Sequence, residues 1–429
     1  MRLFINNGLI VNPENSLETM GDLVIEDGVI KEISLHRNQK PGQDELKDKT
    51  EKIDTEEEIH LDVQGRWIVP GLIDLHVHLR EPGFEYKEDI ESGCRSAAKG
   101  GFTTICCMPN TSPVIDSSYV VLMIDSRAEE SNGVQVLCIG ASTKGQEGKE
   151  LADYEGMLRT GSHSAQLTGS GICGISDDGK TVQDDNLMLA SMIKAKELGL
   201  TVFSHAEPEA EIVKRDLTLA EATGCKLHFC HISEKRSIDL IREAKKRGIN
   251  VTAETAPHYF SLSCSDVDGD TNKKMNPPLR QKADVEAVRQ ALKDGTIDAI
   301  ATDHAPHHER EKDLPFEEAP NGVIGLETSF PVSYTELVKT GILTPLELIS
   351  KMSTKPAEIL GINRGSLWIG EPADLTIIDV EKEYEIQSEA FESKGKNSPF
   401  LGKKVSGQTV CTVVDGQIVW KNETGNMEV

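Results

Sequence analysis

The chain contains 429 residues, 38% of them hydrophobic, and its 71 acidic and 46 basic side chains give a formal net charge of −25. So acidic a surface would repel a phosphate backbone, and nucleic acid is therefore not expected as a partner. No run of 18 or more apolar residues occurs, and the first residues lack a small-residue cleavage site, so we expect neither a membrane span nor a signal peptide.

The N-terminal segment predicts β-structure. Short alternating apolar runs at 2–11 and 22–35, interrupted by Gly, Asn and Asp, are typical of antiparallel strands joined by turns. Residues 36–59 are instead almost entirely polar and charged, and this composition predicts an extended surface loop or hairpin.

From Trp67 onward, short apolar runs that end in polar clusters alternate with longer amphipathic segments. The amphipathic segments 185–199, 233–248 and 284–295 each combine helical spacing with a closing Gly, as helices do. Eight strand–helix repeats with buried parallel strands predict an α/β fold, a TIM-type (β/α)8 barrel over residues 67–365. The eight apolar runs are 67–78, 101–110, 134–143, 171–179, 200–207, 226–233, 249–259 and 297–307.

The end of the chain returns to strand patterns, at 374–380, 384–386 and 410–420. We expect these strands to join the N-terminal ones, so that residues 1–66 and 366–429 form one small β-sandwich-like domain beside the barrel. The nine cysteines lie mostly in apolar stretches and form no CxxC pair. This pattern favours buried thiols in a reducing cytoplasm and argues against a cysteine-based zinc site.

Histidine and aspartate residues gather where the barrel strands are expected to end. The first strand ends in an HxH pair, His76 and His78, whose side chains face the same side because strand residues i and i+2 do so. The carboxyl ends of barrel strands share one rim. Nitrogen and oxygen donors there suit Zn²⁺, or Mn²⁺ or Co²⁺, and suffice for two ions that share a bridging carboxylate or hydroxide. Further strand ends contribute Asp178, His205, His231 and Asp303.

Asp303, on the last strand, is a candidate for proton transfer. Metal ions would lower the pKa of a bridging water, and a carboxylate beside that water could pass its proton to a departing amide nitrogen. The alternative role of Asp303 is that of a metal ligand only, and the two roles are compatible.

Arg80 leaves the barrel mouth two residues after His78. Its planar fork suits a bidentate grip on a carboxylate, with Asn110 and His307 as further donors. An anionic substrate follows from this interpretation. The alternative is a structural ion pair of Arg80 with Glu81, Glu85 or Glu88.

Nine motifs follow one another in the order of a known family and cover nearly the whole chain. The chain resembles the amidohydrolase superfamily and, within it, the type I bacterial class of dihydroorotases. The motifs are DLHVHLREPG (74–83), CMPNT (107–111), GISDDG (174–179), SHAE (204–207), CHIS (230–233), NPPLR (276–280), ATDHAPH (301–307), GLETSFP (325–331) and SKGKNSPF (393–400).

The resemblance implies a cytoplasmic, zinc-dependent enzyme that interconverts dihydroorotate and N-carbamoyl-aspartate in pyrimidine biosynthesis. It implies that Asp178 bridges two Zn²⁺ ions and that Asp303 shuttles the proton. A homodimer is the family-based expectation, and association with aspartate transcarbamoylase is left open. The implied metal ligands are His76, His78, Asp178, His205, His231 and Asp303. The implied substrate contacts are Arg80, Asn110 and His307 at the carboxylate, and Asn276, Asn321 and Gly322 at the ring.

The chain departs from the family's pattern in two places near the site. Only 25 residues separate His205 from His231, where family members commonly carry a longer excursion. Asn321 stands where the family usually has an aromatic residue. Substrate closure, subunit contacts and the wall that binds the ring are therefore open questions, whereas the charged segment 36–59 resembles an insertion in the small domain, away from the site.

Two other functions compete with this one. Hydantoinases, dihydropyrimidinases and allantoinases share the barrel and the HxH pair but are expected to use a bridging lysine, for which Lys180 is a candidate. We favour Asp178 because it sits at the strand end and because Arg80 would serve no purpose for an uncharged ring. An inactive homologue that acts as a scaffold is expected to have lost several ligands, and all six are present here.

Overall fold

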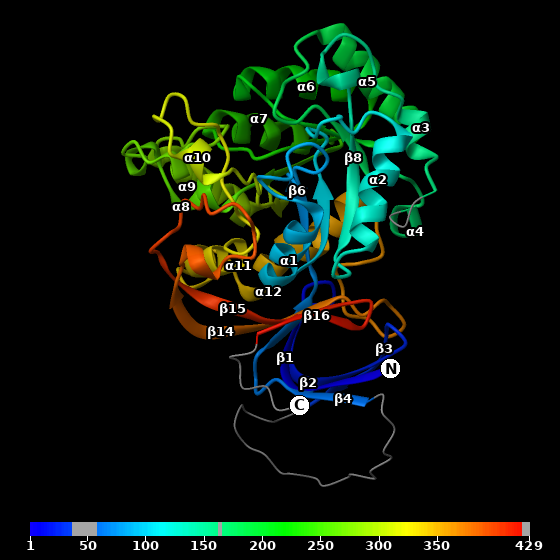
Figure 1. Ribbon diagram of the computed structural model, residues 1–429, viewed down its shortest axis with the longest axis vertical. Coiled ribbons are helices and arrows are strands. Elements are labelled where there is room, and N and C mark those ends of the chain that lie inside the picture. Colours follow the sequence, from blue (N-terminus) through cyan, green and yellow to red (C-terminus); the bar gives the residue numbers. More distant parts are fainter. Residues whose placement is uncertain (37–57, 162–164, 423–429) are drawn as a thin grey trace.

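Two units build the structure, a barrel of parallel strands and a sheet made from both ends of the chain (Figure 1). The computed structural model describes residues 1–36, 58–161 and 165–422. The charged segment 36–59, expected as a surface loop or hairpin, lies outside these described residues except at its ends. Its last two residues, Glu58 and Ile59, begin strand β4.

Each of the eight apolar runs provides one strand of the barrel, and neighbouring strands run parallel. The barrel closes between its first and last strands, where Val77 and His304 form a parallel bridge and the amide of His78 donates to the carbonyl of His304 over 2.8 Å. The predicted TIM-type barrel is thus confirmed. Its strands are β6 (Leu72–Val77), β7 (Phe102–Cys107), β8 (Gln135–Ala141), β9 (Gly174–Ser176), β10 (Thr201–Ser204), β11 (Lys226–Phe229), β12 (Val251–Thr255) and β13 (Ala299–Ile300).

Helices cover the outside of the barrel, and local signals explain their bounds. Helix α5 begins after Asp184, whose carboxylate accepts from the amide of Leu187, and ends at Gly199 with a φ of 75°, as N-caps and C-terminal glycines do. The three segments predicted to be helical form α5, α7 and α9. The longer helices are α1 (Ile90–Gly100), α2 (Ser118–Glu129), α5 (Asp185–Leu198), α6 (Glu209–Thr223), α7 (Lys235–Lys246) and α9 (Lys282–Asp294), and the shorter ones are α3 (Tyr154–Leu158), α4 (Ala165–Thr168), α8 (Pro257–Ser261), α10 (Glu309–Lys312), α11 (Ser329–Ser333), α12 (Pro345–Ile349) and α13 (Lys355–Leu360).

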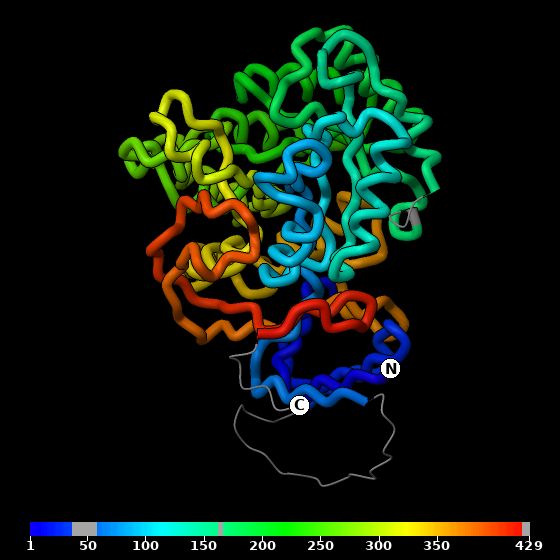
Figure 2. Tube along the Cα trace, in the orientation of Figure 1, coloured from blue at the N-terminus to red at the C-terminus, as the bar shows by residue number. Residues whose placement is uncertain are grey.

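Strands from both ends of the chain form one mixed sheet with the order β16-β15-β14-β5-β1-β2-β3, and β4 pairs with β1. Figure 2 shows the N-terminal strands in blue and the C-terminal ones in red gathered in the same unit. Apolar side chains of β1, β2, β3, β5, β14 and β15 enclose a common core, which confirms the sandwich-like domain. The strands are β1 (Arg2–Asn12), β2 (Leu17–Glu26), β3 (Val29–Leu35), β4 (Glu58–Asp62), β5 (Trp67–Pro70), β14 (Leu375–Glu385), β15 (Lys404–Val414) and β16 (Gln417–Lys421).

Strand β5 connects the two halves of this sheet, because it pairs parallel with β1 and antiparallel with β14. The sequence places Trp67–Pro70 in the range expected for the barrel, whereas its hydrogen bonds belong to the terminal sheet. The domain ranges 1–66, 67–365 and 366–429 stay predictions, and the pairing of β5 favours a first boundary after Pro70.

Seven of the nine cysteines are buried, Cys173 is half-buried and Cys264 is exposed, and all nine are free thiols. The stretch between His205 and His231 contains helix α6 and strand β11, one complete helix–strand step of the barrel. Within the described ranges, no helix is long and apolar enough to cross a membrane.

Candidate functional site

The six residues expected as metal ligands meet at the carboxyl rim of the barrel. His76 lies in β6, and the other five follow the ends of β6, β9, β10, β11 and β13 by one to three residues. Each of the six exposes 7% or less of its surface. The convergence expected from the strand ends is therefore found.

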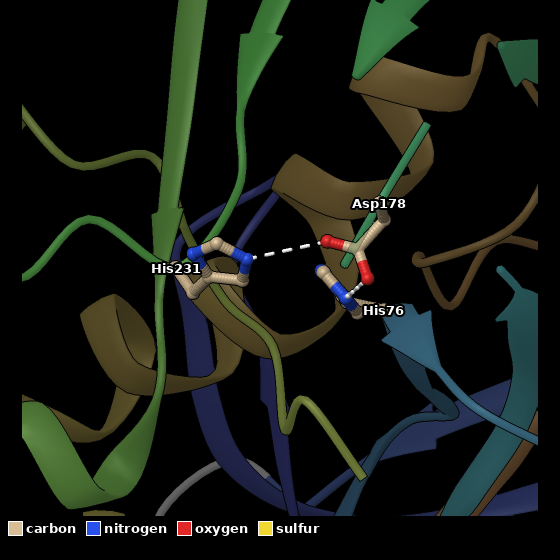
Figure 3. A group of neighbouring side chains, drawn as sticks. All are labelled: His76, Asp178 and His231. Carbon is tan, nitrogen blue, oxygen red and sulfur yellow. Dashed lines mark hydrogen bonds and ion pairs between the residues drawn. The ribbon is translucent and has the colours of Figure 1, made fainter. Parts of the chain in front are cut away.

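Asp178 lies at the centre of this cluster, between two pairs of histidines. Its Oδ2 is 3.3 Å from Nε2 of His76 and 3.4 Å from Nε2 of His78. Its Oδ1 is 3.3 Å from Nδ1 of His205 and 3.3 Å from Nε2 of His231. Figure 3 shows the carboxylate with one oxygen toward His76 and the other toward His231. One carboxylate thus spans two groups of nitrogen donors.

Asp303 completes the first of these groups. Its Oδ1 is 3.1 Å from Nε2 of His78 and 3.6 Å from Nε2 of His76. Donor atoms of His76, His78 and Asp303 all lie within 4.8 Å of one another, and so do those of His76, Asp178 and His231. This arrangement offers two adjoining sets of nitrogen and oxygen ligands that share Asp178.

The buried carboxylates of the cluster are stabilised by positive charge close to them. Burial disfavours a charged His205, yet its interactions with Asp178 and Glu207 outweigh this and raise its pKa to about 9. Burial likewise disfavours the ionised Asp178, but the neighbouring histidines hold the pKa of this carboxyl well below its usual value. Among the described residues the buried Nε2 of His76 makes no hydrogen bond, although Oδ2 of Asp178 lies 3.3 Å away. Donors of this chemistry, with a lone pair left unused, fit divalent metal ions.

Residues behind the cluster fix the orientation of its histidines. Nδ1 of His76 is 3.0 Å from Glu254, and Nδ1 of His78 is 2.8 Å from Oδ1 of Asn110. Glu254 is also bound by Nε2 of His228 over 3.1 Å. Burial opposes its ionisation, but hydrogen bonds from His228 and His76 lower its pKa to about 2. Proton donation from Nδ1 leaves Nε2 of His76 and His78 free to ligate, which is how such partners act in metal sites.

Sequence reasoning missed Glu254. The only available signal was an acidic residue inside the buried apolar run 249–259. A third buried trio, His76, Cys230 and Glu254, also has suitable spacing. Burial raises the pKa of the Cys230 thiol, so it stays protonated, and Glu254 is already engaged by two histidines.

The backbone is strained at three site residues, since φ is 64° at Arg80, 37° at His231 and 49° at Asp303. Such conformations persist only where the surroundings fix them. Asp74 supplies part of that fixation, because its Oδ1 accepts from the amides of His76 and Thr302, each over 3.1 Å. Burial raises the pKa of Asp74 to about 7.

Arg80 reaches over the rim without a carboxylate partner among the described residues. Its Nε donates to the carbonyl of Pro306 over 3.1 Å, and burial lowers its pKa from the usual value. The glutamates considered as structural partners are engaged elsewhere. Glu81 pairs with Arg127, Glu85 accepts from the amide of Gly83 and Glu88 pairs with His304.

His307 stands beside Arg80, and Nη2 of Arg80 is 3.4 Å from its Nε2. Burial, together with Arg80 and Lys87, lowers the pKa of His307 to about 3. The neutral ring donates from Nε2 to the carbonyl of Asn321 over 2.8 Å and accepts from Nζ of Lys87 over 3.3 Å at Nδ1. Lys87 therefore adds a cation that sequence reasoning did not identify.

The remaining predicted substrate contacts, Asn276, Asn321 and Gly322, line a pocket at the mouth of the barrel beside the ligand cluster. Nδ2 of Asn276 donates to Glu207 over 2.8 Å and lies 3.4 Å from Nε2 of His205. Gly322 has a φ of 133°, and a Cβ there would lie 2.9 Å from both Ala305 and His307, so the position requires glycine. The pocket is lined by His78, Arg80, Asn110, Asp178, Gly179, His205, His231, Asn276, Asp303, Ala305, His307, Asn321 and Gly322.

Every site residue expected from the sequence except His76, which is fully buried, lines this pocket. Lys180 does not line it. Its side chain is exposed, and Nζ donates to the carbonyl of Gln146 over 3.1 Å. The aspartate at the strand end, and not the lysine after it, therefore occupies the central position.

Known proteins with similar sequence or structure point to one family. The amidohydrolase family matches residues 67–419. A dihydroorotase of Trichlorobacter lovleyi is 43% identical, covering 98% of this chain and 99% of that protein. A dihydroorotase of Geobacter sp. strain M21 is 44% identical, covering 98% and 100%. Both alignments extend over 449 positions, more than the 429 residues of this chain, so segments are inserted or deleted between the proteins.

Among solved structures, an L-hydantoinase from Arthrobacter aurescens superimposes with a TM-score of 0.84 over 100% of this chain and 97% of that chain, at 24% identity. At that identity the likeness shows a common fold. The full-length relatives carry more weight, because their identity of 43–44% extends over 98% of this chain. The chain therefore belongs to the amidohydrolase family and, within it, to the group of the dihydroorotases.

Proposed function

We propose that this protein is a cytoplasmic dihydroorotase, which reversibly hydrolyses the cyclic amide of (S)-dihydroorotate to N-carbamoyl-L-aspartate in pyrimidine biosynthesis. One observation carries the proposal beyond the family. A half-buried guanidinium, that of Arg80, stands beside the metal-type cluster and has no carboxylate partner among the described residues. A substrate that brings its own carboxylate supplies the missing partner.

We assign two Zn²⁺ ions to the cluster. His76, His78, Asp178 and Asp303 would hold one ion, and Asp178, His205 and His231 would hold the other. Bound ions of this kind act as Lewis acids that lower the pKa of water and polarise a carbonyl. The observed spacing of the two oxygens of Asp178, each 3.3 Å from its nearest histidine nitrogen, supports a bridging role.

Substrate orientation falls to the residues around Arg80. Arg80 would bind the substrate carboxylate through its free Nη atoms, with Asn110 and the neutral His307 beside it. Asn276, Asn321 and Gly322 would contact the ring. Gly322 packs directly on Ala305 and His307, so this wall of the pocket has little room to shift, and the ring carbonyl would face the cluster.

The reaction then needs one attack and one proton transfer. The oxygen of water attacks the ring carbonyl carbon, and the bond from that carbon to the ring nitrogen breaks. Asp303 takes one proton of the water and delivers it to the departing nitrogen, and the second proton is released to solvent as the new carboxylate forms on N-carbamoyl-aspartate. In the reverse direction Asp303 removes the proton from the carbamoyl nitrogen as the ring closes, and this proton together with one from solvent leaves with the carboxylate oxygen as water. The buried position of Asp303, beside His78, suits this role.

The two competing functions have less support. A hydantoinase-type enzyme would gain nothing from the unpaired charge of Arg80, and its bridging lysine would have to be Lys180, which is exposed. An inactive scaffold would not need six intact donors in contact. A homodimer and an association with aspartate transcarbamoylase stay predictions from the family.

Dihydroorotate, dihydrouracil and allantoin distinguish the candidates directly. The purified protein should consume dihydroorotate, followed by its ultraviolet absorbance, and not the two uncharged rings. Prior removal of metal with a chelator should abolish turnover, and added Zn²⁺ should restore it. Preference for dihydrouracil or allantoin would move the function to the hydantoinase group, and no turnover of any ring by the zinc-loaded protein would favour the scaffold.

Arg80→Lys tests the carboxylate grip. An ammonium keeps the charge but cannot form two parallel hydrogen bonds, so KM for dihydroorotate should rise by about 10-fold or more, equivalent to about 1.4 kcal/mol. Steady-state kinetics on the zinc-loaded variant give the measurement, and Arg95→Lys on the exposed face of α1 is the matched control. An unchanged KM would contradict the role given to Arg80.

Glu254→Gln tests the support behind the metal ligands. The amide keeps the shape but removes the charge that His76 and His228 share, and loss of such a partner typically weakens metal binding by about 10–100-fold. Competition with a chromogenic chelator measures the zinc affinity without reference to turnover. Glu286→Gln, an exposed position on α9, should bind zinc like the wild type. Equal affinity of both variants would remove Glu254 from the site.

A further inference from the structure

The SKGKNSPF segment, residues 393–400, has no role in the proposed reaction, yet it lies against the site. It belongs to the connection between β14 and β15 of the terminal sheet. Six of its eight residues, Ser393, Gly395, Asn397, Ser398, Pro399 and Phe400, are buried. A segment of the small domain thus packs into the wall of the barrel mouth.

Asn397 makes the central contacts of this segment. Its Oδ1 accepts from the amide of His307 over 3.0 Å, and its Nδ2 donates to the carbonyls of Ala305 and Gly322 over 3.2 and 3.0 Å. Its own carbonyl accepts from the amide of Ile324 over 3.1 Å. The Asn397 side chain is 3% exposed. Its hydrogen bonds join two loops, 305–307 and 321–322, and both loops line the substrate pocket.

We propose that Asn397 is a positioning residue that sets the distance between His307 and the 321–322 backbone, and thereby the shape of the carboxylate subsite. The inference rests on the proposed function. Asn397 does not line the pocket itself, so it acts only through the backbone it binds. Gly322 shows how tight the fit is, because a single added carbon there would lie 2.9 Å from Nε2 of His307.

The segment that carries Asn397 is itself anchored by two buried glutamates. Glu327 accepts from the amides of Glu392 and Ser393 over 2.9 and 3.1 Å. Glu88 accepts from the amide of Lys394 over 3.2 Å and pairs with His304, the residue after Asp303, over 3.4 Å. These contacts fix the start of the segment, at Ser393 and Lys394.

At Gly395 the segment packs closely against Pro306, the residue whose carbonyl binds Arg80. A Cβ at Gly395 would lie 2.7 Å from Cβ of Pro306, and the carbonyl of Pro306 accepts from Nε of Arg80. The same segment therefore supports both groups that we assign to the substrate carboxylate, His307 through Asn397 and Arg80 through Pro306.

Asn397→Asp is the sharpest test, because it keeps the size and the Oδ1 acceptor but turns two donated hydrogen bonds into contacts between a carboxylate and two carbonyls. We expect KM for dihydroorotate to rise by about 10-fold or more, kcat to change by less than about 3-fold, and bound zinc to stay at the wild-type level. The control Asn186→Asp carries the same charge change on the exposed face of α5 and should leave all three quantities unchanged.

A second readout does not depend on turnover. In Asn397→Ala the amide of His307 loses its acceptor, so hydrogen exchange in peptides covering 305–307 and 321–324 should accelerate by about 10-fold or more, and peptides of α5 should not change. Gly395→Ala keeps the Asn397 side chain but places a carbon 2.8 Å from its Oδ1 and 2.7 Å from Cβ of Pro306. It should raise KM in the same way and serves if Asn397→Ala does not fold.

The outcomes separate the inference from the proposed function. A wild type that does not turn over dihydroorotate, with exchange accelerated in Asn397→Ala, would defeat the function and retain the positioning of the two loops. Normal turnover by the wild type, with wild-type KM in Asn397→Asp and unchanged exchange in Asn397→Ala, would overturn the positioning role alone. A loss of zinc in Asn397→Asp would overturn it too, because the residue would then support the metal cluster.

Discussion

The structure depends on one electrostatic constraint, the burial of two carboxylates, Asp178 and Asp303, among four imidazoles. Neither carboxylate has an arginine or lysine within ion-pair distance in the part of the chain that the structure describes. Removing such charges from water is costly unless positive charge compensates them. The compensating charge must come from protons on the histidines or from bound metal, and the tautomers set by Glu254 and Asn110 favour metal.

Much of the fold follows from this requirement. The six donors come from five strands, so these strands must close accurately into the barrel for the donor atoms to meet. Asp74 ties the first and last strands together from inside, through the amides of His76 and Thr302. The backbone is strained at His231 and Asp303, where the chain leaves its strand and directs a ligand side chain into the cluster. In the proposed reaction, substrate selection falls to the residues around Arg80, against which residues 393–400 of the terminal unit pack.

The sequence was sufficient to predict the site residues that lie at the ends of barrel strands. His76 and His78 share a face by the period of two, and Asp178, His205, His231 and Asp303 follow apolar runs, so their convergence could be predicted. Glu254 could not, because it lies within its strand and points beneath the rim. Asn397 was missed because its partners lie about 75–92 residues away in the chain. The sequence did not show that β5 pairs with β1 and β14, because the apolar pattern continues unbroken through Pro70 and Gly71 and periodicity does not tell which sheet a strand joins.

The two departures from the family's pattern have physical consequences of different size. At Asn321 the backbone carbonyl binds His307, and the side chain is exposed, so this contact is available to any residue. The short connection between His205 and His231 still forms helix α6 and strand β11, and the ligands at its two ends meet at Asp178. The ligand cluster is therefore complete without a longer excursion.

The central claim is that Asp178 bridges two metal ions. It is tested most directly by anomalous diffraction at the zinc edge from crystals grown with zinc. We predict two peaks, one on each side of the Asp178 carboxylate, one among His76, His78 and Asp303 and the other beside His205 and His231. A single peak, or two peaks that do not share Asp178, would contradict the account.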